Sequence, residues 1–298
     1  MVPSRLAAIL ICIPALAAAQ PFGASLDVEI GRNLFARNWV SAPSSTGADD
    51  GLGPLFDAVS CSNCHVSPTV RITEPFETPP GMVIRLGNEV GSGDPVYGHQ
   101  LQTRGLQLQM AEGLPDISFA DTGGLRETHL TLHRLGYGEL AGDTKYALRR
   151  PLRVEGVGIL AKVPDVEILS RATDDQTHQV ISGRPSWVAD GNGVRRLGRF
   201  GWRANQPDLR GQTELAFSRD LGLSTSGQPG AWGECTETQI VCRDAPHGAA
   251  PGEVEISDEM RDLIVAFLEA LPAPRMAPAN KEGERLFAQL ECGACHTV

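Results

Sequence analysis

Apolar positions follow a helical period in only a few segments of this chain. One such segment ends near Asn38, and another begins after Ser257, whose side chain can accept a free backbone N–H group of a helix. Pro272 ends the second segment, because proline cannot continue a helix. The predicted apolar faces are Leu26, Ile30, Leu34 and Phe35 in the first helix, and Met260, Leu263, Ile264, Phe267 and Leu271 in the second.

Between these helices, short runs of residues predict strands. Residues 82–85 and 129–133 are the clearest, since the second run places Leu130 and Leu132 on one face and polar side chains on the other. Residues 273–279 are rich in proline and predict a linker. Asn280 follows the linker and can cap a helix that leads to the end of the chain.

Composition indicates a globular chain with much irregular structure. Glycine (33) and proline (21) are abundant among the 298 residues, and both interrupt regular elements. Aromatic residues make up only 5%, so we expect a large cofactor to fill part of the core. The net charge of -10, without a basic cluster, argues against nucleic-acid binding, because phosphate contacts need a basic face.

Residues 1–19 predict an export signal. Arg5 precedes the apolar residues 6–16, and Ala17–Ala19 form a cleavage site before Gln20. The apolar run is shorter than the ~18 residues of a membrane-spanning helix, so a retained anchor is the weaker alternative. We expect a periplasmic mature chain that meets a membrane only during export.

Two Cys-x-x-Cys-His motifs stand out, one at Cys61, Cys64 and His65, the other at Cys292, Cys295 and His296. This is the attachment pattern of c-type haem. Cysteines three apart on one helical turn can bond the two vinyl groups of haem, and the adjacent histidine can then ligate the iron. The sequence therefore predicts two covalently bound c-type haems, with His65 and His296 as proximal iron ligands.

Other uses of the cysteines remain open. A zinc site would have to join the two motifs, although paired zinc motifs usually lie within about 20 residues of each other. A thioredoxin-like dithiol is the other alternative, but neither motif has a recognisable strand–helix context. The remaining pair, Cys235 and Cys242, is expected to form a structural disulfide in an oxidising compartment, with a redox-active disulfide as the alternative.

A short pattern, Gly-x-x-Leu-Phe-Ala, precedes both motifs at residues 31–36 and 283–288 and indicates a duplication. We therefore predict a mainly α fold with long loops and a few short strands, built from two cytochrome c-like haem modules. The first would span residues 20–272, and the second would begin at residue 280, after the linker.

The second module is expected to be incomplete. A cytochrome c module needs a crossing C-terminal helix and a second axial ligand after its haem motif, whereas only Thr297 and Val298 follow His296. We expect residues 280–298 to be the start of a module in a longer protein. Completion by a partner chain is the less favoured alternative.

Several segments occur together in an order typical of one family. They are Gly51–His65, Pro95–Gln102, Ile181–Pro185, Leu197–Ala204, Asp220–Gly222, the Cys235–Cys242 loop and Gly283–His296. With these segments the chain resembles, over roughly residues 30 to 298, the di-haem oxidoreductases, relatives of bacterial di-haem cytochrome c peroxidases.

The resemblance implies an enzyme in which one haem passes electrons and the other reacts with peroxide. Related peroxidases place a Gln and a Glu beside the N-terminal haem, and Gln102 and Glu112 match by position and chemistry. Glu155 interrupts an apolar run and is a further candidate for proton transfer, and Trp202 is a candidate electron relay. Ordinary surface or packing roles are the alternatives for all four.

Calcium is doubtful at the position where the family usually has a run rich in Asp and Gly. The corresponding residues, 173–180, hold only two carboxylates here, and calcium takes six to eight oxygen ligands.

The predicted function is an exported, peroxidase-like di-haem oxidoreductase that receives electrons from a small donor protein or a quinol-linked donor. The alternative is an electron-carrier di-haem cytochrome without a catalytic site.

Overall fold

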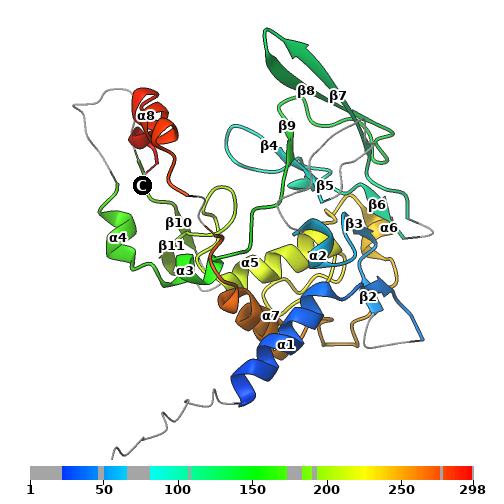
Figure 1. Ribbon diagram of the computed structural model, residues 1–298. Coiled ribbons are helices and arrows are strands. Elements are labelled where there is room, and N and C mark those ends of the chain that lie inside the picture. The colour runs from blue at the N-terminus through cyan, green and yellow to red at the C-terminus, as the bar shows by residue number, and fades with distance from the viewer. Residues whose placement is uncertain are drawn as a thin grey trace, which may run out of the picture.

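The computed structural model describes residues 22–45, 50–65, 81–106, 109–172, 183–189, 193–275 and 278–296. Two regions singled out in the sequence, the predicted export signal at residues 1–19 and the run at 173–180, lie outside the described residues. Figure 1 gives the arrangement of the elements.

Three helical segments form the centre of the molecule: α1 (Phe22–Ala36), α5 (Leu209–Ala216) and α7 (Asp258–Ala270). A π-helical turn, Phe217–Leu221, continues α5. The helices α1 and α7 touch at the backbone, because a Cβ atom added to Gly31 would lie only 2.0 Å from the carbonyl oxygen of Leu263. The core between these elements consists of Leu34, Phe35, Trp39, Leu52, Phe56, Phe200, Leu209, Phe217, Leu221, Leu223, Ile256, Ile264, Val265 and Leu268.

The sequence-based prediction of these helices is confirmed with one difference. The Ser257 hydroxyl accepts the Met260 N–H at 3.2 Å and caps α7, as expected. On α1, however, Leu26 and Ile30 are exposed, and only Leu34 and Phe35 of the predicted apolar face are buried. The N-terminal end of α1 projects beyond the elements that cover its other end (Figure 1).

The remaining helices are short. They are α2 (Cys61–Cys64), α3 (Val157–Lys162), α4 (Asp165–Leu169), α6 (Ile240–Arg243), α8 (Lys281–Gln289) and a 3-10 turn at Cys292–Ala294. The predicted cap of α8 is confirmed, since the Asn280 side chain accepts the N–H groups of Glu282 and Gly283 at 3.0 and 3.1 Å.

The described strands form five small sheets. The three-stranded sheet has the order β5 (Gln100–Leu101), β4 (Val83–Gly87) and β9 (Lys145–Arg149), all antiparallel. The longest pair is the hairpin of β7 (Leu114–Thr122) and β8 (Leu125–His133), which projects from the body in Figure 1. The other pairs are β1 (Val40–Ser41) with β2 (Asp50–Leu52), β3 (Leu55–Phe56) with β6 (Arg104–Gly105), and β10 (Trp187–Ala189) with β11 (Arg195–Leu197).

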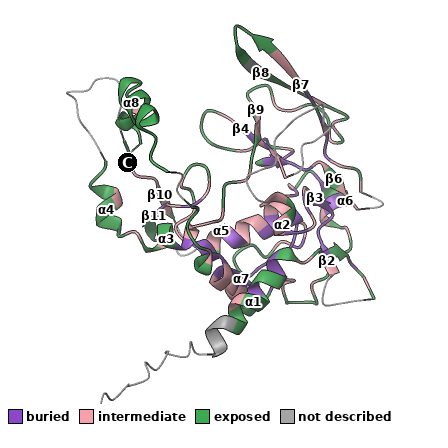
Figure 2. Ribbon diagram, in the orientation of Figure 1, coloured by how far each residue is buried: buried purple, intermediate pink, exposed green. Residues whose placement is uncertain are grey.

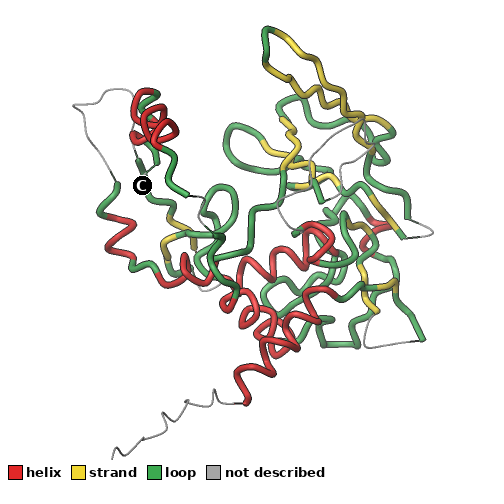
Figure 3. Tube along the Cα trace, viewed as in Figure 1, coloured by secondary structure: helices red, strands yellow, loops and turns green. Residues whose placement is uncertain are grey.

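The predicted mainly α fold is wrong. Strands account for 22% of the structure and helices for only 29%, so the fold is mixed, with loops as its largest part (Figure 3). Both predicted strands are present, but most of the others are two or three residues long. Such strands are too short to show an alternating pattern, and some pair with a distant segment, as β3 does with β6.

Buried residues gather around α5 and α7, whereas most of α8 is exposed (Figure 2). Within α8 only Phe287 is half-buried. The division into a module at 20–272 and a second one from 280 stays a prediction. None of the helices in the described ranges combines the length and apolar character needed to cross a bilayer.

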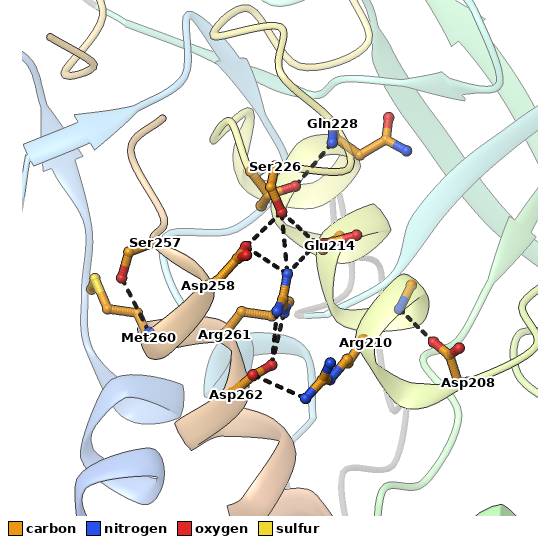
Figure 4. A network of polar contacts seen from close by, with 12 residues as sticks. Asp208, Arg210, Glu214, Ser226, Gln228, Ser257, Asp258, Met260, Arg261 and Asp262 are labelled. Carbon is orange, nitrogen blue, oxygen red and sulfur yellow. Dashed lines mark hydrogen bonds and ion pairs between the residues drawn. The ribbon is translucent and has the colours of Figure 1, made fainter. Parts of the chain in front are cut away.

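A buried arginine joins α5 to α7 (Figure 4). Arg261 on α7 donates to Glu214 on α5 at 2.7 Å, and to Asp258 and Asp262 on its own helix at 2.7 and 2.9 Å. Ser226, in the turn after α5, also contacts this guanidinium at 3.2 Å. The network therefore fixes the two helices that carry much of the core.

Candidate functional site

The first Cys-x-x-Cys-His motif forms one helical turn, α2, that is partly buried against the body of the protein. The N–H of His65 donates to the carbonyl oxygen of Cys61 at 3.0 Å, which closes the turn. Cys61 packs against the main core, Ser60 just before the motif is completely buried, and Cys64 is partly buried. Burial, followed by the charge of Asp220, raises the pKa of the Cys61 and Cys64 thiols to about 12, so both are neutral thiols.

The orientation of His65 suits an iron ligand. Its Nδ1 lies 2.9 Å from the carbonyl oxygen of Leu152. Because a carbonyl oxygen can only accept, Nδ1 carries the proton and Nε2 keeps its lone pair. Burial lowers the pKa of His65, which also favours the neutral ring that a metal needs. Haem-binding histidines are typically held in this way, so the donor set of Cys61, Cys64 and His65 fits a c-type haem.

A buried polar cluster lies beside α2. The Gln100 amide donates to Asp57 at 2.7 Å and to Asp220 at 2.9 Å, so one side chain bridges two carboxylates. Thr103 donates to Asp57 through its backbone N–H at 2.9 Å and its hydroxyl at 2.7 Å. Burial nevertheless raises the pKa of Asp57 to about 6. Asp220 links this cluster electrostatically to α2, since its charge acts on both thiols and on the ring of His65.

The structure brings Gln102 and Glu112 together within this region. The Gln102 N–H donates to the carboxylate Oε2 of Glu112 at 2.6 Å, and the Glu112 N–H donates to the Gln102 carbonyl oxygen at 2.9 Å. Both residues are almost completely buried, with exposed fractions of 3% and 2%. The Gln102 amide nitrogen donates to the carbonyl oxygen of Arg219 at 2.7 Å, while its Oε1 is buried without a hydrogen-bond partner.

Burial raises the pKa of Glu112 to about 8. The donors on its two oxygens, the Gln102 N–H and the Gln239 amide, oppose this rise, and the negative charges of Asp57 and Glu234 add to it. Glu112 therefore exchanges its proton near neutral pH, which is the property of a general acid–base group.

Sequence reasoning missed Gln239, which donates to Oε1 of Glu112 at 2.5 Å. Gln239 lies within the loop that the Cys235–Cys242 disulfide closes, with 6.2 Å between the two Cα atoms. The spacing of the cysteines drew attention to this loop. Nothing in its sequence distinguishes the buried Gln239 from its exposed polar neighbours.

A charged pair, Arg219 and Glu234, lies next to the start of the disulfide loop. Arg219 lies 2.5 Å from Glu234, and His99 lies 3.3 Å from the same carboxylate oxygen. Desolvation acts against the ionised form of Glu234, but His99 and Arg219 together hold the pKa of this carboxyl below its usual value. No pattern in the sequence indicated these contacts, because His99, Arg219 and Glu234 come from three separate segments.

Glu155 and Trp202 lie near residues 150–152, the segment whose Leu152 carbonyl contacts His65. The Trp202 indole N–H donates to the carbonyl oxygen of Arg150 at 3.1 Å, although its side chain is 58% exposed. Glu155 is partly exposed beside Arg153, at 3.4 Å, and its charge acts on His65. The structure therefore places Glu155 near His65, whereas Gln102 and Glu112 contact each other.

The second Cys-x-x-Cys-His motif is exposed. It follows α8, and the N–H of His296 donates to the carbonyl oxygen of Cys292 at 2.9 Å, as in the first motif. Cys292 is half-buried, Cys295 is exposed, and both are free thiols. In the described ranges, no group of three or more His, Cys, Asp or Glu side chains is arranged to hold a metal ion by itself.

Comparison with known proteins identifies one family. The family described as "Di-haem oxidoreductase, putative peroxidase" matches residues 136–298, which is more than half of the chain. The match includes the second haem motif, the disulfide loop and Trp202, and it begins after the first motif. No curated protein and no solved structure matches the chain.

Proposed function

The chain belongs to the di-haem oxidoreductase family, and on this premise we propose that it is a peroxidase-like enzyme with two covalently bound c-type haems. Peroxide would be reduced beside the attachment turn α2, with electrons that arrive through the second haem. The observation that carries this proposal is the buried pair of Gln102 and Glu112, joined by hydrogen bonds and adjacent to the polar cluster that reaches Cys61 and Cys64.

The chain's own residues would hold the haems. Cys61 and Cys64 would form the two thioether bonds at the first site, and Nε2 of His65 would bind the iron, because Nδ1 is occupied by Leu152. Cys292, Cys295 and His296 provide the same donor set at the second site. When bound, haem supplies the iron that exchanges electrons with the substrate.

Reduction of peroxide to two waters consumes two electrons from the donor and two protons from solvent, and Glu112 would move a proton between the two peroxide oxygens. Cleavage of the O–O bond is helped when a base takes a proton from one oxygen and returns it to the other. A carboxyl with a pKa of about 8 can do both near neutral pH. The unpartnered Oε1 of Gln102 would accept a hydrogen bond from the peroxide O–H, which would satisfy this buried acceptor and orient the substrate.

Trp202 would relay electrons toward the first site. Its indole is bound to the carbonyl of Arg150, two residues before Leu152, whose carbonyl holds His65. A small donor protein or a quinol-linked donor would supply the electrons. Export to the periplasm, where c-type haems are attached, belongs to the same proposal.

The test compares E112Q with the matched control E127Q, in which the changed carboxylate is exposed on β8. We expect E112Q to lower kcat for peroxide by roughly 10²–10⁴-fold, the usual contribution of a general acid–base group, and E127Q to retain wild-type kcat. Both variants should keep the mass of two haems. Wild-type turnover by E112Q would contradict the proposed role of Glu112.

Spectroscopy separates the enzyme from the electron carrier. The enzyme should contain one high-spin haem that binds cyanide, and C61A/C64A should remove covalent haem from that site alone. Two low-spin haems that neither bind cyanide nor react with peroxide would favour the electron-carrier cytochrome.

A further inference from the structure

Gln239 is fully buried, and both atoms of its side-chain amide are used. The backbone N–H of Thr236 donates to Oε1 of Gln239 at 2.7 Å. Because a backbone N–H can only donate, this contact fixes the orientation of the amide. The Nε2 group must therefore face Glu112, to which it donates at 2.5 Å.

The disulfide loop holds Gln239 in this position. Cys235 and Cys242 close the loop, and both pack into a small apolar cluster with Leu55. The Thr236 hydroxyl donates to the carbonyl oxygen of Val96 at 2.7 Å, which ties the loop to the body of the protein. Within the loop, the Gln239 N–H donates to the Thr236 carbonyl oxygen at 3.0 Å.

We propose that Gln239 is a positioning residue for Glu112 and that the Cys235–Cys242 disulfide is the brace that holds it there. With Gln239 on Oε1 and the Gln102 N–H on Oε2, both carboxyl oxygens face a donor. This arrangement fixes the plane of the carboxyl group and stabilises its ionised form, the form that can take a proton from a peroxide. The inference rests on the proposed function of Glu112.

The acidic groups around Glu112 raise its pKa, whereas the hydrogen bond from Gln239 lowers it. Asp57 beside β3 and Glu234 beside the disulfide are acidic, and both disfavour a further negative charge. Tyr97 and Tyr137 also interact with Glu112, and their pKa values are raised, mainly by burial, so both remain neutral phenols. Gln239 is therefore the side-chain donor that opposes the rise in the pKa of Glu112 caused by burial.

The location of the disulfide favours a permanent brace over a redox switch. Cys242 is completely buried and Cys235 nearly so. Exchange with an external thiol requires access of the attacking thiolate to one of the two sulfur atoms. Reduction of this bond in the folded protein is therefore expected to be slow.

The experiment measures the protonation of Glu112 directly, by infrared pH titration of the protonated carboxyl band in the oxidised holoprotein. The band is assigned by its absence in E112Q, and its midpoint in the wild type is expected near pH 8. Q239M keeps the length of the side chain but has no amide donor. Its midpoint should rise by about one to two pH units, the effect of one hydrogen bond to a charged group.

Four further variants complete the design. Q239N has an amide too short to reach both Thr236 and Glu112, so its midpoint should also rise, even if Q239M does not fold. E237Q changes an exposed residue of the same loop and should keep the wild-type midpoint. C235A/C242A should raise the midpoint, and the addition of Q239M should then raise it no further, since both changes remove the same contact.

The outcomes separate this inference from the proposed function. Unchanged midpoints in Q239M and Q239N would overturn the positioning role, whether or not E112Q loses turnover. An unchanged midpoint in C235A/C242A would overturn the brace. If the midpoint rises while the pH profile of peroxide turnover stays in place, Gln239 positions Glu112 as inferred, and the acid–base role of Glu112 fails.

Discussion

At the scale of single residues, burial acts in opposite directions on the two groups closest to the proposed chemistry. It lowers the pKa of His65 and raises that of Glu112, because in both cases the low-dielectric interior disfavours the charged form. The result is a neutral imidazole suited to bind iron and a carboxyl group that can hold a proton near neutral pH. Neither property follows from residue type alone.

The raised pKa of Glu112 has a consequence for stability. The carboxyl binds its proton more tightly in the folded than in the unfolded state, so between about pH 4.5 and 8 the folded state holds more protons. The free energy of unfolding from this group therefore falls as pH rises through that range, by up to ~1.4 kcal/mol per pH unit. Denaturant unfolding should show this slope in the wild type and a smaller slope in E112Q.

The exposed Glu253 provides the control for this measurement. Since E253Q retains Glu112 and Asp57, it should show the same dependence on pH as the wild type. Equal slopes in E112Q and the wild type would mean that Glu112 is not protonated in the folded protein at neutral pH.

At the scale of elements, the two copies of the Gly-x-x-Leu-Phe-Ala pattern lie in different surroundings. In α1 the glycine, Gly31, touches the backbone of α7, and the Leu and Phe that follow are buried. In α8 the glycine, Gly283, has only ordinary contacts with Asn280. The same local pattern therefore forms a packed helix in one place and an exposed helix in the other.

Alanine substitution at the two glycines tests this difference. G31A should destabilise the protein by about 1–3 kcal/mol or more, because the new Cβ atom would overlap the carbonyl of Leu263. G283A should leave the stability of the body unchanged and increase the helicity of α8, since alanine favours helix by ~1 kcal/mol over glycine. Denaturant unfolding and circular dichroism measure the two effects, and equal destabilisation by both would contradict the described packing.

At the scale of the whole molecule, contacts between distant segments hold together a fold with few long elements. Arg261 is the clearest case, because it joins α7, α5 and the turn at Ser226 (Figure 4). Its side chain is only 9% exposed, and that of its partner Glu214 is 14% exposed. Loss of the guanidinium would leave a largely buried carboxylate without its partner.

R261M should therefore lower the free energy of unfolding by about 2–4 kcal/mol, somewhat less than for a fully buried ion pair. The matched control is R210M, because Arg210 bonds Asp262 of the same network but is 62% exposed. Its loss should cost no more than ~1 kcal/mol. Equal losses in the free energy of unfolding of R261M and R210M would show that the burial of Arg261 does not increase the contribution of its ion pairs to stability.

Local signals in the sequence could predict several elements, whereas the haem-attachment residues stay a prediction. Ser257 and Asn280 cap their helices as expected, because capping depends on residues only two or three positions apart. The mainly α fold was wrong, because the short strands are paired by tertiary contacts that leave no periodic pattern in the sequence. The pair of Arg219 and Glu234 was not predicted either, because it too depends on a tertiary contact.

From the sequence alone we predict which residues would bond haem, because a Cys-x-x-Cys-His motif and its spacing lie within one helical turn. The family resemblance also identified Gln102 and Glu112 as candidates. Tertiary packing, by contrast, buries these two residues together, brings Gln239 to Glu112 from a distant loop, and leaves the first motif partly buried and the second mostly exposed. Burial and orientation depend on which distant segments pack together, and the chemistry of a carboxyl group or an imidazole depends on both.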